Sequence, residues 1–77
     1  MPIQIELRLY ASLKPLEPAS AASHPLPSGT TVGEVLAGLK VPGDQVKLVF
    51  VNGRKAHRQR VLQDGDRLGV FPPVGGG

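Results

Sequence analysis

The chain has no cysteine and no tryptophan among its 77 residues. Without cysteine it can form neither a disulfide nor a cysteine-ligated metal site, and it offers no thiolate nucleophile and no side-chain persulfide. Its two histidines, His24 and His57, lie in unrelated segments without metal-ligand spacing, so we expect no metal site. Long apolar runs and a secretory signal pattern are also missing, so we expect a cytoplasmic protein without membrane contact.

Aromatic residues are scarce, being limited to Tyr10, Phe50 and Phe71. Three aromatic side chains are too few for the stacking platforms of single-strand binders, so we expect no nucleic-acid partner. Lys and Arg outnumber Asp and Glu by 9 to 6, and much of the excess lies in residues 54–60. This basic segment is typical of a solvated surface or of a surface that meets an acidic partner.

Nothing in the sequence indicates a catalytic side chain. The serines have no base nearby in sequence, which makes them linker hydroxyls and not nucleophiles. A phosphate-binding glycine loop is followed by a helix, whereas the terminal glycine run is followed by none. We therefore expect a protein that is not itself an enzyme and that binds no cofactor of its own.

The first half of the chain predicts a strand, an irregular stretch and a helix. Apolar and polar residues alternate from Ile3 to Tyr10, which indicates a half-buried strand whose Ile and Leu side chains face away from Tyr10. Four prolines between residues 14 and 27 predict a mobile loop that leads into a short edge strand near residues 24–26. The capping-box pattern Thr31-Val32-Gly33-Glu34 then begins a helix with an apolar stripe, which ends at Val41-Pro42-Gly43.

The second half predicts strands and turns. Residues 46–51 are rich in Val, Leu and Phe, and the Asn52-Gly53 pair that follows is a strong hairpin signal. Asp64-Gly65-Asp66 predicts another turn before a last strand at Arg67–Phe71. This order of elements predicts an α+β fold, a ubiquitin-like β-grasp roll with a mixed sheet of four to five strands and one main helix across one face. Residues 1–71 would form this domain and residues 72–77 a flexible, extended tail.

Strand parity divides the side chains of this sheet between two faces. The helix would pack on one face, and the other would stay open with Tyr10, Val49, Val51 and Phe71 on it. This assignment depends on register, because a shift by one residue exchanges the two faces of a strand. In it, the helix covers Ile3, Ile5, Leu7, Leu9, Leu48, Phe50, Leu68 and Val70.

The tail Pro72-Pro73-Val74-Gly75-Gly76-Gly77 is the most informative segment. Its prolines end the strand and project the following residues, and the six tail residues could span about 20 Å when fully extended. Glycine has no Cβ, so such a thread can enter a channel that is too narrow for side chains. The expected reactive group is therefore the terminal carboxylate, which is ionised at neutral pH and must be activated by another protein.

The chain resembles the ubiquitin-like sulfur-carrier family, which comprises the small subunit of molybdopterin synthase and the thiamine-pathway sulfur carrier. The resemblance lies in Leu9-Tyr10-Ala11, residues 49–53, residues 62–66 and above all Phe71–Gly77. The Phe-Pro-Pro step and the chain length favour the molybdopterin synthase subunit. The proline-rich residues 14–27 depart from the helical segment that is usual in the family.

The resemblance implies a reaction and its partners. A ubiquitin-activating-like adenylyltransferase would use ATP to adenylate Gly77, and sulfur from a persulfide donor would convert it to a thiocarboxylate. The large subunit of molybdopterin synthase, or a thiazole synthase, would then receive the tail and its sulfur. Tail threading would involve Pro72, Pro73, Val74, Gly75 and Gly76, and partner binding would involve Phe71, Tyr10 and Lys55. The strand parity described above adds Val49 and Val51 to the partner-binding residues.

Other functions fit the same sequence. The alternatives are a thiamine-pathway sulfur carrier, a ubiquitin-like modifier conjugated to proteins through Gly77, and a non-covalent binding module. The sequence leaves open the pathway, the sulfur donor, the oligomeric state and whether a precursor is trimmed to expose Gly77.

Overall fold

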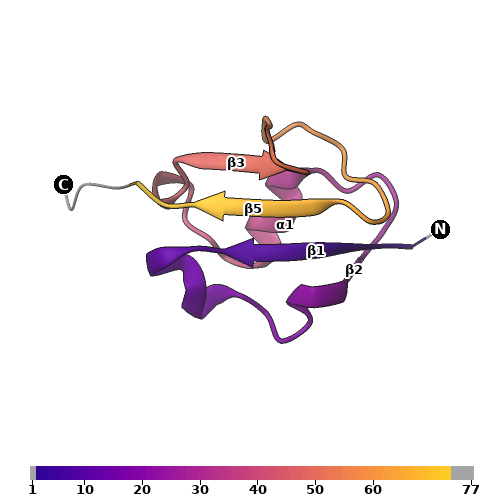
Figure 1. Ribbon diagram of the computed structural model, residues 1–77, viewed down its shortest axis with the longest axis horizontal. Helices are drawn as coiled ribbons and strands as arrows, with labels where there is room; N and C mark the ends of the chain where they lie inside the picture. Colours follow the sequence, from indigo (N-terminus) through magenta and orange to yellow (C-terminus); the bar gives the residue numbers. More distant parts are fainter. Residues whose placement is uncertain (1, 74–77) are drawn as a thin grey trace.

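The computed structural model describes residues 2–73, which form a five-stranded sheet with one α-helix across one face (Figure 1). The strand order is β2-β1-β5-β3-β4, and β1 and β5 run parallel to each other in the middle of the sheet. The other neighbouring strands pair antiparallel. This arrangement confirms the predicted β-grasp fold. The strands are β1 (Ile3–Leu9), β2 (His24–Leu26), β3 (Leu48–Val51), β4 (Arg54–Lys55) and β5 (Arg67–Phe71).

The helix α1 (Val32–Gly38) begins at the predicted capping box. The Thr31 backbone N–H donates to the Glu34 carboxylate at 2.9 Å, and the Glu34 N–H donates to the Thr31 hydroxyl at 3.2 Å. Two of the donors that a helix start leaves unpaired are thereby satisfied. The apolar stripe of α1 is buried against the sheet, where the core is formed by side chains such as Leu7, Leu68 and Val70.

The proline-rich stretch differs from the mobile loop that we expected. Two short 3₁₀ segments form here: Ala11–Leu16, which begins just before the stretch, and Ala21–Ser23 within it. Each anchors one side chain, Leu13 or Ala21, in the core. Proline removes a backbone donor, which prevents a regular α-helix but still allows short 3₁₀ segments. The stretch therefore folds along the sheet and leads into β2 as predicted, and β2 pairs with the first residues of β1.

The two faces of β3 are the reverse of our prediction. Val49 and Val51 are 6% and 1% exposed and lie in the core, whereas Leu48 and Phe50 lie on the open face. The antiparallel register with β5 decides this, because it pairs Val51 with the buried Leu68. Val46 packs against the core but precedes β3, so its burial does not indicate which face of the strand is buried.

Alanine substitutions in β3 test this assignment of faces. Val51→Ala should lower the free energy of unfolding by about 2 kcal/mol, because it leaves a cavity in the core. Leu48→Ala removes more carbon atoms from a half-buried position, and it should cost about 1 kcal/mol or less. Urea unfolding of both variants gives the comparison. A larger loss for Leu48→Ala would contradict the observed faces.

Candidate functional site

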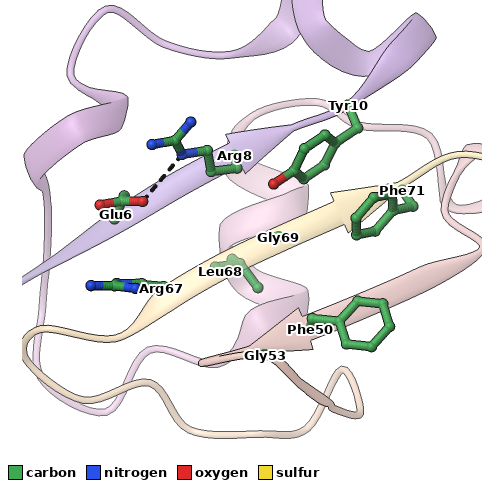
Figure 2. A pocket seen from close by; sticks show the side chains of 9 residues that line it. All are labelled: Glu6, Arg8, Tyr10, Phe50, Gly53, Arg67, Leu68, Gly69 and Phe71. Carbon is green, nitrogen blue, oxygen red and sulfur yellow. Dashed lines mark hydrogen bonds and ion pairs between the residues drawn. The ribbon is translucent and has the colours of Figure 1, made fainter.

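All three aromatic side chains of the protein gather on the open face of the sheet (Figure 2). The rings of Tyr10 and Phe71 are stacked, with centroids 4.2 Å apart and planes within 1° of parallel. Phe50 meets Phe71 edge to face at 5.6 Å. Leu48 lies opposite Phe71 in the β3–β5 ladder and extends the same apolar surface. We call these four residues the aromatic patch.

A groove of about 450 Å³ lies beside the aromatic patch, with Gly69 in its floor (Figure 2). Gly69 faces Arg8 on one neighbouring strand and Phe50 on the other. One end of the groove is aromatic, and the other end is charged. The open-face groove is lined by Glu6, Arg8, Tyr10, Phe50, Gly53, Arg67, Leu68, Gly69 and Phe71.

The charged end of the open-face groove carries more positive than negative charge. The Arg8 guanidinium pairs with the Glu6 carboxylate at 3.1 Å, and Arg67 adds a second guanidinium. Lys55 lies next to the groove, opposite Phe50 in the β3–β4 ladder. The open face thus combines an apolar patch with surrounding cations, which is a composition suited to a protein interface.

Tyr10 is held in place by the residues around the end of β1. Its backbone N–H donates to the Val70 carbonyl at 3.2 Å, and its own carbonyl accepts from Leu13 at 3.0 Å. The chain then turns sharply at Ala11, which has a positive φ of 51°. The N–H of Leu9, the residue before Tyr10, has no strand partner on this side of β1 and donates to the Glu17 carboxylate at 2.9 Å.

This contact changes the ionisation of Glu17. The hydrogen bond from the Leu9 N–H is the largest cause that lowers the pKa of Glu17 below its ordinary value of 4.5. The hydrogen bond and the charge of Lys14 lower this pKa further. A carboxylate that accepts hydrogen bonds is favoured in its charged form. The proline-rich segment therefore supports the strand end that presents Tyr10.

The predicted turn residues hold β5 in register with β3. Asp66 is buried, and its carboxylate accepts from the Asn52 side chain at 2.9 Å and from the Gln63 backbone at 2.8 Å. The Asn52 side-chain oxygen in turn accepts from the Arg67 N–H at 2.9 Å. The Asn-Gly and Asp-Gly-Asp motifs thus fix the register of β5 against β3, which sets the positions of Arg67 and Gly69 relative to Phe50.

The structure brings some of the predicted partner-binding residues together and separates others. Tyr10 and Phe71 stack on each other, and Lys55 lies two strands from Phe71, opposite Phe50 in the β3–β4 ladder. The prediction that Val49 and Val51 face a partner is wrong, because both are buried under the sheet.

Among the predicted tail residues, Pro72 is buried and Pro73 is exposed, directly after β5. Val74, Gly75, Gly76 and Gly77 lie outside the described residues. The alternation of residues along the strands did not predict that Phe50 lies on the open face. It also gave no indication of the groove at Gly69.

The remaining polar groups form no second centre in the part of the chain that the structure describes. Residues 2–73 contain no group of three His, Cys, Asp or Glu residues placed to hold a metal ion. They also contain no helix that is long and apolar enough to cross a membrane. His24 accepts or donates a hydrogen bond with the Ser20 hydroxyl at 2.7 Å. His57 is exposed.

Comparison with protein families identifies the chain, since the model of the ThiS family matches residues 7–77. The chain belongs to the ThiS family. This membership confirms the resemblance to ubiquitin-like sulfur carriers that the sequence predicted. The small carriers of the ThiS family are not catalysts themselves. A comparison with curated protein sequences finds no match.

Solved structures similar to this ThiS family member include three archaeal proteins. The HVO 2177 protein of Haloferax volcanii is 28% identical with a TM-score of 0.74, over 99% of this chain and 88% of that one. The small archaeal modifier protein 1 of H. volcanii is 27% identical with a TM-score of 0.70, over 94% and 99%. A putative molybdopterin converting factor, subunit 1, from Pyrococcus furiosus is 27% identical with a TM-score of 0.67, also over 94% and 99%.

Replacing Glu17 by glutamine tests its role at the end of β1. A carboxylate whose pKa is lowered by folding stabilises the fold above its unfolded pKa, and this stabilisation is lost as the pH falls through the folded pKa. Glu17→Gln should therefore cost about 1 kcal/mol at pH 7, and the difference from the unaltered protein should shrink below pH 4.5. Urea unfolding across this pH range, followed by the emission of the single tyrosine, measures the difference. A difference that does not depend on pH would contradict this role.

Proposed function

We propose that the chain is a sulfur carrier whose Gly77 carboxylate is activated by an ATP-dependent, ubiquitin-activating-like adenylyltransferase. We further propose that it then acts as the small subunit of molybdopterin synthase. Membership of the ThiS family supports the carrier role, and the similarity to the P. furiosus protein supports the molybdopterin branch. The proposal rests on one structural observation: the aromatic patch includes Phe71, the residue directly before the tail.

The proposed reaction requires no catalytic side chain from this chain. A carboxylate oxygen of Gly77 attacks the α-phosphorus of ATP and pyrophosphate leaves, which forms an acyl-adenylate. A persulfide of the donor attacks the acyl carbon and AMP leaves, which forms an acyl disulfide. A thiol then attacks the donor-side sulfur, forms a new disulfide with it and releases the thiocarboxylate. ATP and the persulfide donor belong to the activating system. The glycines of the tail contribute the absence of side chains, which lets the reacting end enter a narrow site.

The open face is the proposed docking surface for both partners, the adenylyltransferase and the large synthase subunit. Stacked aromatic rings that are already in place lose little conformational freedom when a partner covers them. Lys55 can lay its alkyl stem beside Phe50 while its ammonium group stays in water. Docking here places the start of the tail at the interface, because Pro72 follows Phe71 directly.

A second candidate function is supported by the similarity to small archaeal modifier protein 1. In that role the same activated carboxylate would be captured by a lysine amine of another protein. The amine would attack the acyl carbon of the adenylate, AMP would leave, and an isopeptide bond to Gly77 would form. The fold and the docking surface serve both roles equally, so only the chemical fate of Gly77 distinguishes them.

Intact-mass spectrometry tests the carrier role. Incubation with the adenylyltransferase of the source organism, ATP and a persulfide donor should replace one oxygen of the Gly77 carboxylate by sulfur. The protein mass should rise by the difference between these two atoms. A protein modifier would instead yield, after cleavage at Lys and Arg, peptides of other proteins that carry residues 68–77 of this chain on a lysine, joined through Gly77.

Two altered chains provide the controls for this experiment. Removal of Gly76 and Gly77 and conversion of the terminal carboxylate to an amide should each abolish the sulfur addition. Neither change touches the described domain, so thermal unfolding should stay the same in both. Unchanged sulfur addition in the amide form would refute the proposed function.

A further inference from the structure

We propose that the open-face groove is a socket for a two-part anchor on the adenylyltransferase. The anchor consists of an apolar side chain that sits over Gly69 and a neighbouring carboxylate that pairs with Arg67. This inference rests on the proposed function, because it assumes that the adenylyltransferase docks on the open face. It adds the chemistry that the partner must present there.

The apolar half of the socket follows from the geometry at Gly69. A Cβ added at this position would lie 3.5 Å from Cε2 of Tyr10 and 3.9 Å from Cε1 of Phe71, at ordinary van der Waals distances. The missing side chain therefore leaves a hollow in contact with two rings, and Phe50 stands on its other side (Figure 2). An incoming apolar side chain would touch all three aromatic rings. Apolar anchors in such pockets dominate the affinity of many interfaces.

The charged half follows from the balance of ionic groups. The groove lining has two guanidinium groups but a single carboxylate, and that carboxylate, on Glu6, already pairs with Arg8 at 3.1 Å. The ion pairs within residues 2–73 do not include Arg67. Its backbone is fixed by Asn52, which bonds both its N–H at 2.9 Å and its carbonyl at 2.8 Å. Arg67 is thus a cation on a rigid base, and a guanidinium can bind a carboxylate through two parallel hydrogen bonds.

The combination selects one kind of occupant. A second copy of this chain would bring the same positive groove against this one, and like charges oppose such pairing. A nucleic acid would satisfy the cations, but its phosphates would leave the hollow over Gly69 without an apolar partner. A protein loop that carries an apolar residue beside an aspartate or glutamate satisfies both halves of the socket.

The test measures ATP-dependent activation of the full chain by the adenylyltransferase of the source organism, followed as pyrophosphate release. Arg67→Glu should raise KM for the carrier about tenfold at low salt, with kcat unchanged, and added salt should reduce the effect. Lys40→Glu is the matched control, because this lysine is exposed beyond the end of α1 and changes the net charge equally. It should alter KM by less than about twofold.

Two substitutions of Gly69 test the apolar half. Gly69→Val should fill the hollow and raise KM about tenfold at all salt concentrations, because the lost contact is not ionic. Gly69→Ala fits at the distances given above, so it should keep the fold and give a smaller increase. Thermal unfolding and the emission of the single tyrosine show whether each variant retains its structure.

The outcomes separate the socket from the function on which it rests. Equal KM values for Arg67→Glu and Lys40→Glu would overturn the carboxylate contact, and normal KM values for both Gly69 variants would overturn the apolar contact. Self-association that is abolished by Gly69→Val would assign the groove to a second copy and overturn the proposal. If the unaltered chain is not activated at all, the proposed function fails, and the socket inference falls with its premise.

Discussion

The parallel pairing of β1 with β5 is the constraint on which the rest of the structure depends. It joins the first and last strands of the domain and puts their carboxyl ends at the same edge of the sheet. Pairs of buried residues, Leu7 with Leu68 and Leu9 with Val70, hold this alignment from the core side. Because side chains alternate along a strand, each core pair fixes a pair on the opposite face. The core thereby determines where Tyr10 meets Phe71.

A polar network completes this alignment on the β3 side. Burying the Asp66 carboxylate would be costly if it lacked partners, but both of its oxygens accept hydrogen bonds. Its partner Asn52 has a positive φ of 54°, a conformation that asparagine tolerates better than most residues. The two turns therefore specify one register of β5 against β3. This register places Gly69 opposite Phe50 and creates the open-face groove.

Most of the fold could be predicted from the sequence because several local signals agreed. The alternation in β1, the capping box at Thr31 and the two turns each had a direct structural outcome. The buried face of β3 could not be predicted, because its residues are apolar on both sides. Alternation along the strand then does not say which side faces the core, and a contact with another element must decide it. The pairing of Val51 with the buried Leu68 decides the buried face, and this is a contact between distant parts of the sequence.

The candidate site was predictable to a similar degree. Tyr10 and Phe71 follow from short-range parity, but the groove depends on a missing side chain at Gly69 and on three strands at once. Glycine in a strand usually weakens it, so its value here is visible only once the neighbouring rings are placed. The 3₁₀ segments were missed for a related reason. Their anchors, Leu13 and Ala21, are too widely spaced to form a periodic pattern.

Under the proposed function, the arrangement also explains why a carrier needs a well-defined open face. A terminal carboxylate on a free chain would meet its activating enzyme only at its concentration in solution. The proposed docking on the open face would convert this encounter into an intramolecular one, because the six residues after Phe71 can span about 20 Å. Over so short a tether the effective concentration reaches the millimolar range. In the proposed function, the rigidity of the β1–β5 pair would thus matter for the chemistry of the tail, because it fixes the position of Phe71, the residue before the tail.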